Sequence, residues 1–235
     1  MRKIVEGLCM IEGIGTAMVF LLDSPAGCTL IDTGIFKRTH LLIAQLEENG
    51  YSAQDVRTIV LTHCHCDHIG GVTELVKWSG AKVAAHRADI PYIKQEKIIN
   101  GPYRNMMIQE QQVMKKFGCN IDRVDVVLKD GDMINALGGL QVIRVPGHTP
   151  GSIALYQADQ RIMFFGDVIR NNPQQGLQVG VPEDYNVDTE QTRADAHKLL
   201  QYPIDYALFS HGDPILGKAG SVIRKVMEKS SHRKS

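Results

Sequence analysis

The chain has 235 residues, enough for one large domain with a substantial buried core. Its 26 basic and 26 acidic residues balance to a formal net charge of zero, which argues against nucleic acid as a partner. Five scattered cysteines argue against a disulfide framework. The sequence contains no run of about 18 apolar residues, so we expect no membrane span. Glu6 and Glu12 interrupt the apolar stretch that a secretory signal needs, so we expect a cytoplasmic protein.

Apolar runs predict strands along the whole chain, and helical patterns lie between them. The expected strands cover residues 17–22, 28–31, 58–61, 82–85, 124–128, 140–145, 153–156, 162–165 and 206–209. The expected helices cover residues 36–48, 72–78, 189–200 and 219–227. Strands mixed with helices, several of them at hairpin spacing, predict an α/β sandwich. No linker or repeat interrupts the pattern, so we expect a single domain over residues 1–235.

Residues 90–118 form a distinctive insertion that reads as helical after Pro102. It is rich in methionine and aromatic residues, which make adaptable apolar surface. Two interpretations stay open: a lid or substrate wall over an active site, and an ordinary packed helical hairpin. The polar segment 171–188, which contains glycine and proline, is a second candidate wall.

The most informative stretch is His63-Cys64-His65-Cys66-Asp67-His68, directly after the apolar run 59–61. Imidazole nitrogen and carboxylate oxygen are the ligands that zinc and its neighbours prefer. In an extended backbone, residues two apart share a face, so His63 and His65 can hold one ion. If the chain turns into a helix at Asp67, that residue and His68 can face a second ion. The same alternation turns Cys64 away from the histidines, and Cys66 with it if the segment stays extended. We therefore expect both thiols to pack rather than to ligate.

Three later residues of the same chemical kind follow predicted strands at glycine-bearing turns: His148, Asp167 and His211. In open α/β sheets, functional sites collect at such strand ends. A single histidine in this position is usually structural, and Asp167 alone would suit a helix cap. The ordered set makes metal ligation the favoured interpretation.

In type and order these residues resemble the metallo-β-lactamase superfamily of hydrolases. The resemblance rests on the His-x-His-x-Asp-His run at 63–68, on the three later residues, and on Asp32-Thr33-Gly34 near the start. It implies a four-layer αββα sandwich with metals at one edge. It also implies two ligand sets joined by a bridge: His63, His65 and His148 for one metal, Asp67, His68 and His211 for the other, and Asp167 bridging both. Asp32 would orient ligands or solvent, although Asp-Thr-Gly also suits a simple turn.

The mechanism implied by the resemblance is hydrolysis by a metal-bound hydroxide. Two divalent cations can lower the pKa of a shared water from about 15.7 towards about 7, and the hydroxide then attacks a carbonyl carbon. We expect two zinc ions per chain, and manganese or iron also suits these ligands. Asp67, as a proton acceptor, and Asp167 are the candidate catalytic residues. Tyr185 is a candidate hydrogen-bond donor to the oxyanion, with a plain surface tyrosine as the alternative.

Among the activities of this superfamily, we expect cleavage of an ester, thioester or lactone. Asp167 argues against a true β-lactamase, because those members usually lack the bridging aspartate. Long glyoxalase-II-like thioesterases carry a C-terminal region that grips glutathione, whereas only residues 212–235 follow His211 here. Related lactonases tend to have a tyrosine three residues after the bridging aspartate, and this chain has Arg170.

A persulfide-dioxygenase-like oxidoreductase with a single iron is the alternative function. RNA processing is disfavoured by the neutral charge, and a purely structural metal site is disfavoured by the complete ligand set. We expect a small-molecule substrate and neither nucleic acid nor a membrane as partner. The sequence leaves the oligomeric state open.

Overall fold

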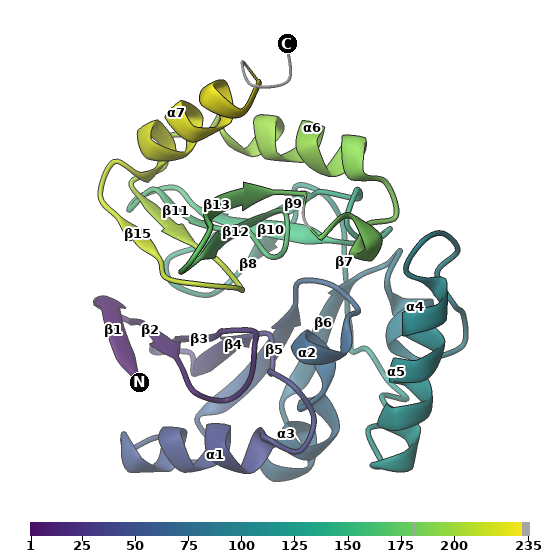
Figure 1. Cartoon of the computed structure of the whole chain (residues 1–235). Helices are drawn as coiled ribbons and strands as arrows, with labels where there is room; N and C mark the ends of the chain where they lie inside the picture. Colours follow the sequence, from purple (N-terminus) through teal and green to yellow (C-terminus); the bar gives the residue numbers. More distant parts are fainter. Residues whose placement is uncertain (181, 232–235) are drawn as a thin grey trace.

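Two β-sheets pack face to face between two layers of helices in the computed structural model, which describes residues 1–180 and 182–231 (Figure 1). The first sheet has the strand order β1-β2-β3-β4-β5-β6-β7, and the second has the order β15-β14-β11-β10-β9-β8. Helices α1 and α3 cover the outer face of the first sheet, and α6 and α7 cover that of the second. The predicted four-layer αββα sandwich is confirmed.

The first half of the chain forms the first sheet and its helices. Its strands are β1 (Arg2–Val5), β2 (Leu8–Ile11), β3 (Val19–Leu22), β4 (Cys28–Ile31), β5 (Val56–Leu61), β6 (Lys82–His86) and β7 (Val126–Leu128). The strands from β1 to β4 are antiparallel, and those from β4 to β7 are parallel. The helices are α1 (Thr39–Glu48), α2 (Cys66–Ile69), α3 (Val72–Ser79), α4 (Ile90–Ile93) and α5 (Arg104–Lys116).

The second half forms the second sheet and a separate hairpin. The sheet contains β8 (Met133–Ile134), β9 (Leu140–Arg144), β10 (Ile153–Gln157), β11 (Ile162–Phe164), β14 (Tyr206–Leu208) and β15 (Ile215–Leu216). The hairpin pairs β12 (Ile169–Asn172) with β13 (Gly176–Val179). The remaining elements are the 3₁₀ turn η1 (Glu183–Tyr185) and helices α6 (Thr189–Leu199) and α7 (Ala219–Ser231).

Alternating side chains of the central strands enter different core layers. Val60 and Phe164 meet between the two sheets, whereas Ile59 packs toward α1 and α3, and Phe165 packs toward α6 and α7. Because these strands are buried on both faces, they appear in the sequence as continuous apolar runs. Every predicted strand is present, with ends that shift by at most two residues.

The sequence did not predict six of the strands: β1, β2, β8, β12, β13 and β15. They are short, and several carry exposed polar residues, such as Arg2 and Lys3 in β1. The first helix was predicted from residue 36 but begins at Thr39, because the chain first makes a turn with a positive φ at Lys37.

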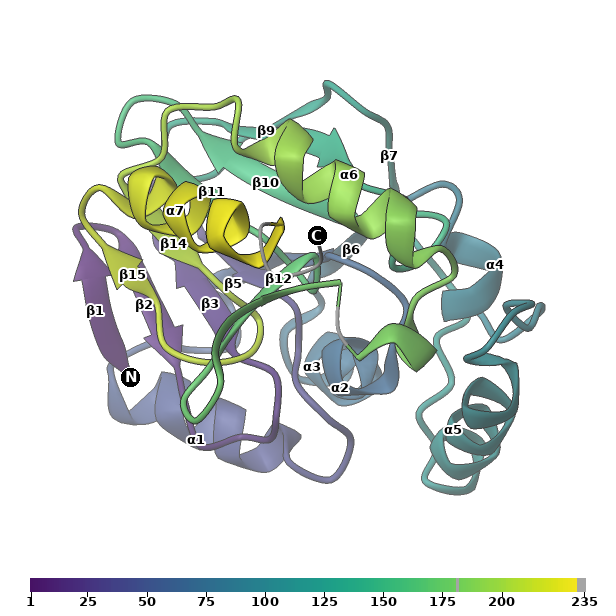
Figure 2. The same ribbon diagram turned by 45° about the horizontal axis from the view of Figure 1, so that its top comes forward.

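The insertion at residues 90–118 lies beside the sandwich as α4, a connecting loop and α5 (Figure 2). Helix α5 confirms the predicted helix after Pro102. Ile93, Tyr103, Met107 and Met114 are buried in the core layer of the first sheet. The insertion is therefore firmly packed, as the helical-hairpin interpretation expects, and a lid role stays a prediction. Among the described helices, none is both long and apolar enough to cross a bilayer.

Candidate metal centre

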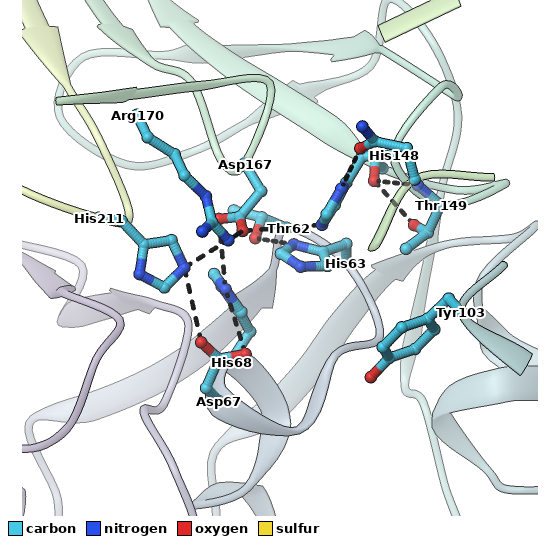
Figure 3. A network of polar contacts seen from close by, with 12 residues as sticks. Thr62, His63, Asp67, His68, Tyr103, His148, Thr149, Asp167, Arg170 and His211 are labelled. Atoms are coloured by element: carbon cyan, nitrogen blue, oxygen red, sulfur yellow. Dashed lines mark hydrogen bonds and ion pairs between the residues drawn. The ribbon is translucent and has the colours of Figure 1, made fainter. Parts of the chain in front are cut away.

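The ligand-type residues predicted from the sequence meet at one edge of the two sheets (Figure 3). The run 63–68 leaves the end of β5, whereas His148, Asp167 and His211 follow β9, β11 and β14. Both sheets direct the ends of these strands to the same edge, so residues about 150 positions apart become neighbours.

Three groups of side chains bring their donor atoms within 4.8 Å of one another: His63, His65 and His148; His63, His68 and Asp167; Asp67, His68 and His211. Asp167 faces both outer groups. Its Oδ2 lies 3.1 Å from Nε2 of His211 and 3.7 Å from Nε2 of His148. The predicted pairing of residues into two sets with a carboxylate between them thus has the matching geometry, while the metal roles themselves stay predictions.

These donor atoms fit a cation because they are buried and lack hydrogen-bond partners. Within the described part of the chain, six of them have no hydrogen-bond partner: Nε2 of His63, His65, His68, His148 and His211, and Oδ1 of Asp167. Leaving a buried polar atom unsatisfied costs roughly 1–3 kcal/mol, so six at one point indicate a missing common partner. Imidazole and carboxylate donors suit divalent transition metals.

In four of the histidines, a contact to Nδ1 orients the ring whose Nε2 belongs to the donor set. Nδ1 of His68 contacts Asp32 at 2.8 Å, that of His148 contacts Oδ1 of Asn186 at 2.8 Å, and that of His211 contacts the Thr16 carbonyl at 3.0 Å. Nδ1 of His63 lies 3.1 Å from the Thr62 hydroxyl, which itself donates to Asp32. With Nδ1–H donating to these acceptors, the Nε2 atom of each of these rings is directed into the centre.

Asp32 follows the end of β4 in the left-handed backbone region, at φ 61°. Its Oδ1 accepts the backbone N–H of Thr62 at 2.8 Å, and its Oδ2 accepts the Thr62 hydroxyl at 2.7 Å. Aspartate tolerates this conformation better than most residues, and such strain often marks functional positions. Asp32 therefore joins Thr62, at the end of β5, to His68, in the orienting place that the resemblance implied.

The protonation states differ among the donor residues. Burial, with the neighbouring imidazoles, holds the pKa of His63 and of His65 well below the usual value, and burial also lowers the pKa of His148. These rings are neutral at neutral pH. Burial opposes charge on His68 too, but the carboxylates of Asp67, Asp167 and Asp32 raise its pKa to about 10. Burial disfavours the Asp167 carboxylate, yet His211, His68 and Arg170 hold its pKa well below the usual range.

The two cysteines of the motif lie outside the three donor groups. Both are buried in the core layer of the first sheet, and burial raises the pKa of each thiol. Helix α2 begins at Cys66, so the assumption that Cys66 continues the extended segment is wrong. Its thiol nevertheless packs toward Glu110 of α5, away from the donor set.

A cavity of about 710 Å³ opens beside Asp67 and His211. It is lined by Thr16, Met18, Asp67, Arg170, Asn172, Pro173, Gln175, Gln178, Pro182, Tyr185, His211 and Gly212. The predicted polar wall at 171–188 thus contributes to it, including Tyr185. Helices α4 and α5 contribute none of its described lining. The insertion comes near the donor set at Tyr103, directly before α5, whose ring centre lies 4.2 Å from that of His65.

Sequence reasoning missed the residues that orient the ligands. Thr62 adjoins the motif, but nothing in its type singled it out. Asn186 and the Thr16 carbonyl come from distant loops, and no local pattern connects them to His148 or His211. Arg170 was noticed as a departure from related lactonases, but its contact with Asp167, 2.5 Å from Nη2 to Oδ2, was not expected.

A family model described as the metallo-beta-lactamase superfamily matches residues 13–211, a span that contains every donor described above. The chain belongs to this superfamily. Three curated relatives extend the comparison. The chain is 24% identical to the probable metallo-hydrolase YflN of Bacillus subtilis (strain 168), over 92% of this chain and 86% of that protein.

The other two relatives are longer. The chain is 35% identical to hydroxyacylglutathione hydrolase of Ectopseudomonas mendocina (strain ymp), over 64% of this chain and 46% of that protein. It is 27% identical to the acyl-coenzyme A thioesterase MBLAC2 of Homo sapiens, over 67% of this chain and 60% of that protein. In both cases it spans less than two thirds of the relative.

Solved structures support the fold. The metallo-beta-lactamase family protein TTHA1429 from Thermus thermophilus superposes with a TM-score of 0.76 at 21% identity. The match covers 99% of this chain and 81% of that one. At this identity the similarity concerns the fold alone.

Proposed function

We propose that the protein is a metal-dependent hydrolase that holds two zinc ions and cleaves an ester, thioester or lactone carbonyl. Membership of the superfamily and the assembled donor set support a metallo-hydrolase. The observation that carries the proposal is the convergence of six buried, unpaired donor atoms beside an open cavity. A purely structural zinc site would be closed and would often use thiolates, whereas this site adjoins space for a substrate.

In the proposed site, His63, His65 and His148 would hold one cation, and Asp67, His68 and His211 would hold the other. Asp167 would contribute to both sets. When bound, such cations supply Lewis acidity toward a carbonyl oxygen and lower the pKa of an attacking water. The orienting contacts to Asp32, Asn186 and Thr16 keep each Nε2 in place before the cation arrives.

Two residues at the cavity would act on the substrate. Oδ2 of Asp67 accepts a hydrogen bond from the Thr16 hydroxyl at 3.0 Å and also lines the cavity, so it can accept a proton there. Tyr185 lines the same cavity. Burial, followed by the charges of Glu110 and Asp67, raises the pKa of Tyr185, so its phenol stays protonated and can donate to a developing oxyanion.

The carbonyl substrate class rests on the chemistry of the site and on two relatives. One relative is named as a hydrolase of hydroxyacylglutathione and another as an acyl-coenzyme A thioesterase. Both names describe removal of an acyl group, and we extend that chemistry to this chain. Neither glutathione nor coenzyme A is part of the proposal.

The test begins with metal content by elemental analysis of protein purified without added metal. A panel of lactone, thioester and β-lactam substrates follows on the same sample. His148→Gln is compared with His197→Gln, which removes an exposed imidazole from α6. We expect about two zinc ions per chain, acyl cleavage without β-lactam cleavage, and loss of both metal and activity in His148→Gln only.

Other outcomes would redirect the assignment. About one iron per chain, no hydrolysis, and oxygen uptake with a persulfide substrate would support the dioxygenase alternative and refute the hydrolase. Full activity in metal-stripped protein would refute both.

A further inference from the structure

The β12–β13 hairpin presents one polar face to the cavity beside the donor set. β12 begins two residues after Asp167, and Arg170 pairs with Gln178 across the hairpin. Alternate residues of a strand share a face, and Arg170, Asn172 and Gln178 all line the cavity. The two strands therefore face the cavity with one guanidinium and two amides, and Gln175 of the connecting turn adds a third amide.

The hairpin is tied to the loop that carries His211. The backbone N–H of Asn171 donates to the His211 carbonyl at 2.9 Å. Gly212, at φ +94°, approaches so closely that a Cβ there would lie 1.7 Å from the Asn171 carbonyl oxygen. Only glycine permits this approach. The backbone of Arg170 is therefore held in place beside the loops that carry Asp167 and His211.

Arg170 carries a buried donor that no protein acceptor uses. Its Nη2 contacts Oδ2 of Asp167 at 2.5 Å, and its side chain is 21% exposed. Its Nε is buried and, among the described residues, has no hydrogen-bond partner. Guanidinium donors form a planar fork that matches a carboxylate, and no described residue accepts a hydrogen bond from the Nε of this fork.

The cavity lining carries one guanidinium and one carboxylate. Apart from the imidazole of His211, Arg170 is the one basic side chain among the described lining residues. Asp67 is the one carboxylate among them, and its oxygens lie 3.5 to 3.7 Å from Nε2 of His211 and His68. Cations at the donor set would compete with Arg170 for Asp167 and leave the guanidinium free for the cavity.

We propose that Arg170 recognises a carboxylate of the substrate, so that the preferred substrates are acyl compounds with a carboxylate near the scissile carbonyl. This inference rests on the proposed hydrolase function and adds the substrate class to it. Asn172 and Gln178 complete the subsite as neutral hydrogen-bonding neighbours.

A binding experiment tests the subsite without turnover. Calorimetry compares succinate with butyrate on the metal-loaded protein: each offers one carboxylate to the metals, and succinate alone offers a second. Wild type should bind succinate at least about tenfold more tightly, because hydrogen bonds to a charged group contribute that much. Arg170→Gln should bring the ratio close to one at unchanged metal content, and Arg170→Lys should give an intermediate ratio.

The control is Lys225→Gln, which removes an exposed positive charge from α7 and should keep the wild-type ratio. A wild-type ratio near one, undetectable succinate binding, or a preference that survives in Arg170→Gln would overturn the inference.

An activity experiment shows which half of the substrate carries the anion. Succinyl and butyryl thioesters of one neutral thiol test the acyl half, and butyryl thioesters of 3-mercaptopropionate and of propanethiol test the leaving half. A preference for the anionic member of either pair that Arg170→Gln removes supports the inference. Hydrolysis without any such preference refutes it. Absence of all hydrolysis, with the succinate preference intact, refutes the hydrolase proposal and keeps the anion subsite.

Discussion

Asp32 holds His68 in place: its Oδ2 lies 2.8 Å from Nδ1 of the imidazole, and both side chains are almost fully buried. The contact directs Nε2 of His68 toward Asp67 and Asp167. Orientation of a ligand by its second nitrogen is how proteins commonly tune a metal site. Asp32 should therefore affect metal binding although it lies outside the donor groups.

Asp32→Asn should weaken metal binding about 10- to 100-fold. The amide keeps one oxygen for the Thr62 N–H but loses the negative charge beside His68. Competition with a chromogenic chelator measures the change. Asp205→Asn, which breaks an exposed ion pair with Arg161, is the control and should leave the affinity unchanged. If Asp32→Asn bound metal with wild-type affinity, the contact between Asp32 and His68 would make no contribution to metal binding.

At pH 8, metal binding should release about one proton from His68 per chain, in addition to the proton that a metal-held water would lose. The pKa of His68, raised to about 10, means that this ring is protonated in the metal-free protein, and a metal ligand must be neutral. His63, His65 and His148 have lowered pKa values and release none. The apparent affinity should accordingly rise with pH until it levels off near pH 10.

Calorimetry in buffers of different ionisation enthalpy counts the released protons. Asp32→Asn should reduce the count, because one of the carboxylates that raise the pKa of His68 is gone. A count near one in wild type, which the water alone would account for, would show that His68 is already neutral.

Asp167→Ala should weaken the binding of both metals and abolish turnover. Its carboxylate faces His148 on one side and His211 on the other, so its loss affects both donor sets. Elemental analysis and circular dichroism together separate metal loss from unfolding. Full metal content with retained activity would contradict the bridging role.

The donor set could be predicted from the sequence because its chemistry is local. Four of its seven members lie in one run of six residues, and the others follow strands whose apolar character is plain. Burial on both faces makes such strands easy to recognise, and strand ends position side chains at a sheet edge. The residue types and their order were therefore enough to predict the donor residues.

The orienting residues could not be predicted, because their role exists only in three dimensions. Asn186 lies 38 positions from His148, and the Thr16 carbonyl lies 195 positions from His211. β12 and β13 were missed for a related reason: Arg170, Asn171 and Asn172 resemble a polar loop, and the bridge from Asn171 to Gly212 joins residues 41 positions apart.

Cys64→Ser should leave the metal content unchanged. The thiol is buried in a core layer, and its raised pKa, caused by burial and then by Asp89, disfavours the thiolate that a metal would need. Thermal unfolding should show a modest loss of about 1 kcal/mol. His65→Ser is the matched contrast and should lose metal. Metal loss in Cys64→Ser would show that the cysteine takes part in the site.

Tyr103 decides between the two interpretations of the insertion. It is 1% exposed, its hydroxyl donates to Glu110, and its ring centre lies 5.3 Å from that of Tyr185. If the insertion is a packing element, Tyr103→Ala should cost about 3–5 kcal/mol of unfolding free energy through the cavity it leaves. Tyr103→Phe keeps the ring and should cost less, about 1–3 kcal/mol, because Glu110 loses a buried partner.

Phe117→Ala, at the exposed end of α5, is the control for substitution within the insertion. It should cost less than Tyr103→Ala, because the Phe117 ring is 41% exposed and leaves a smaller void. Denaturant unfolding gives these energies, and the ratio of kcat/KM for two acyl substrates gives the preference. A changed substrate ratio in Tyr103→Ala with little loss of stability would favour the lid. A large loss of stability with an unchanged ratio in the folded fraction would establish packing as the role of this insertion.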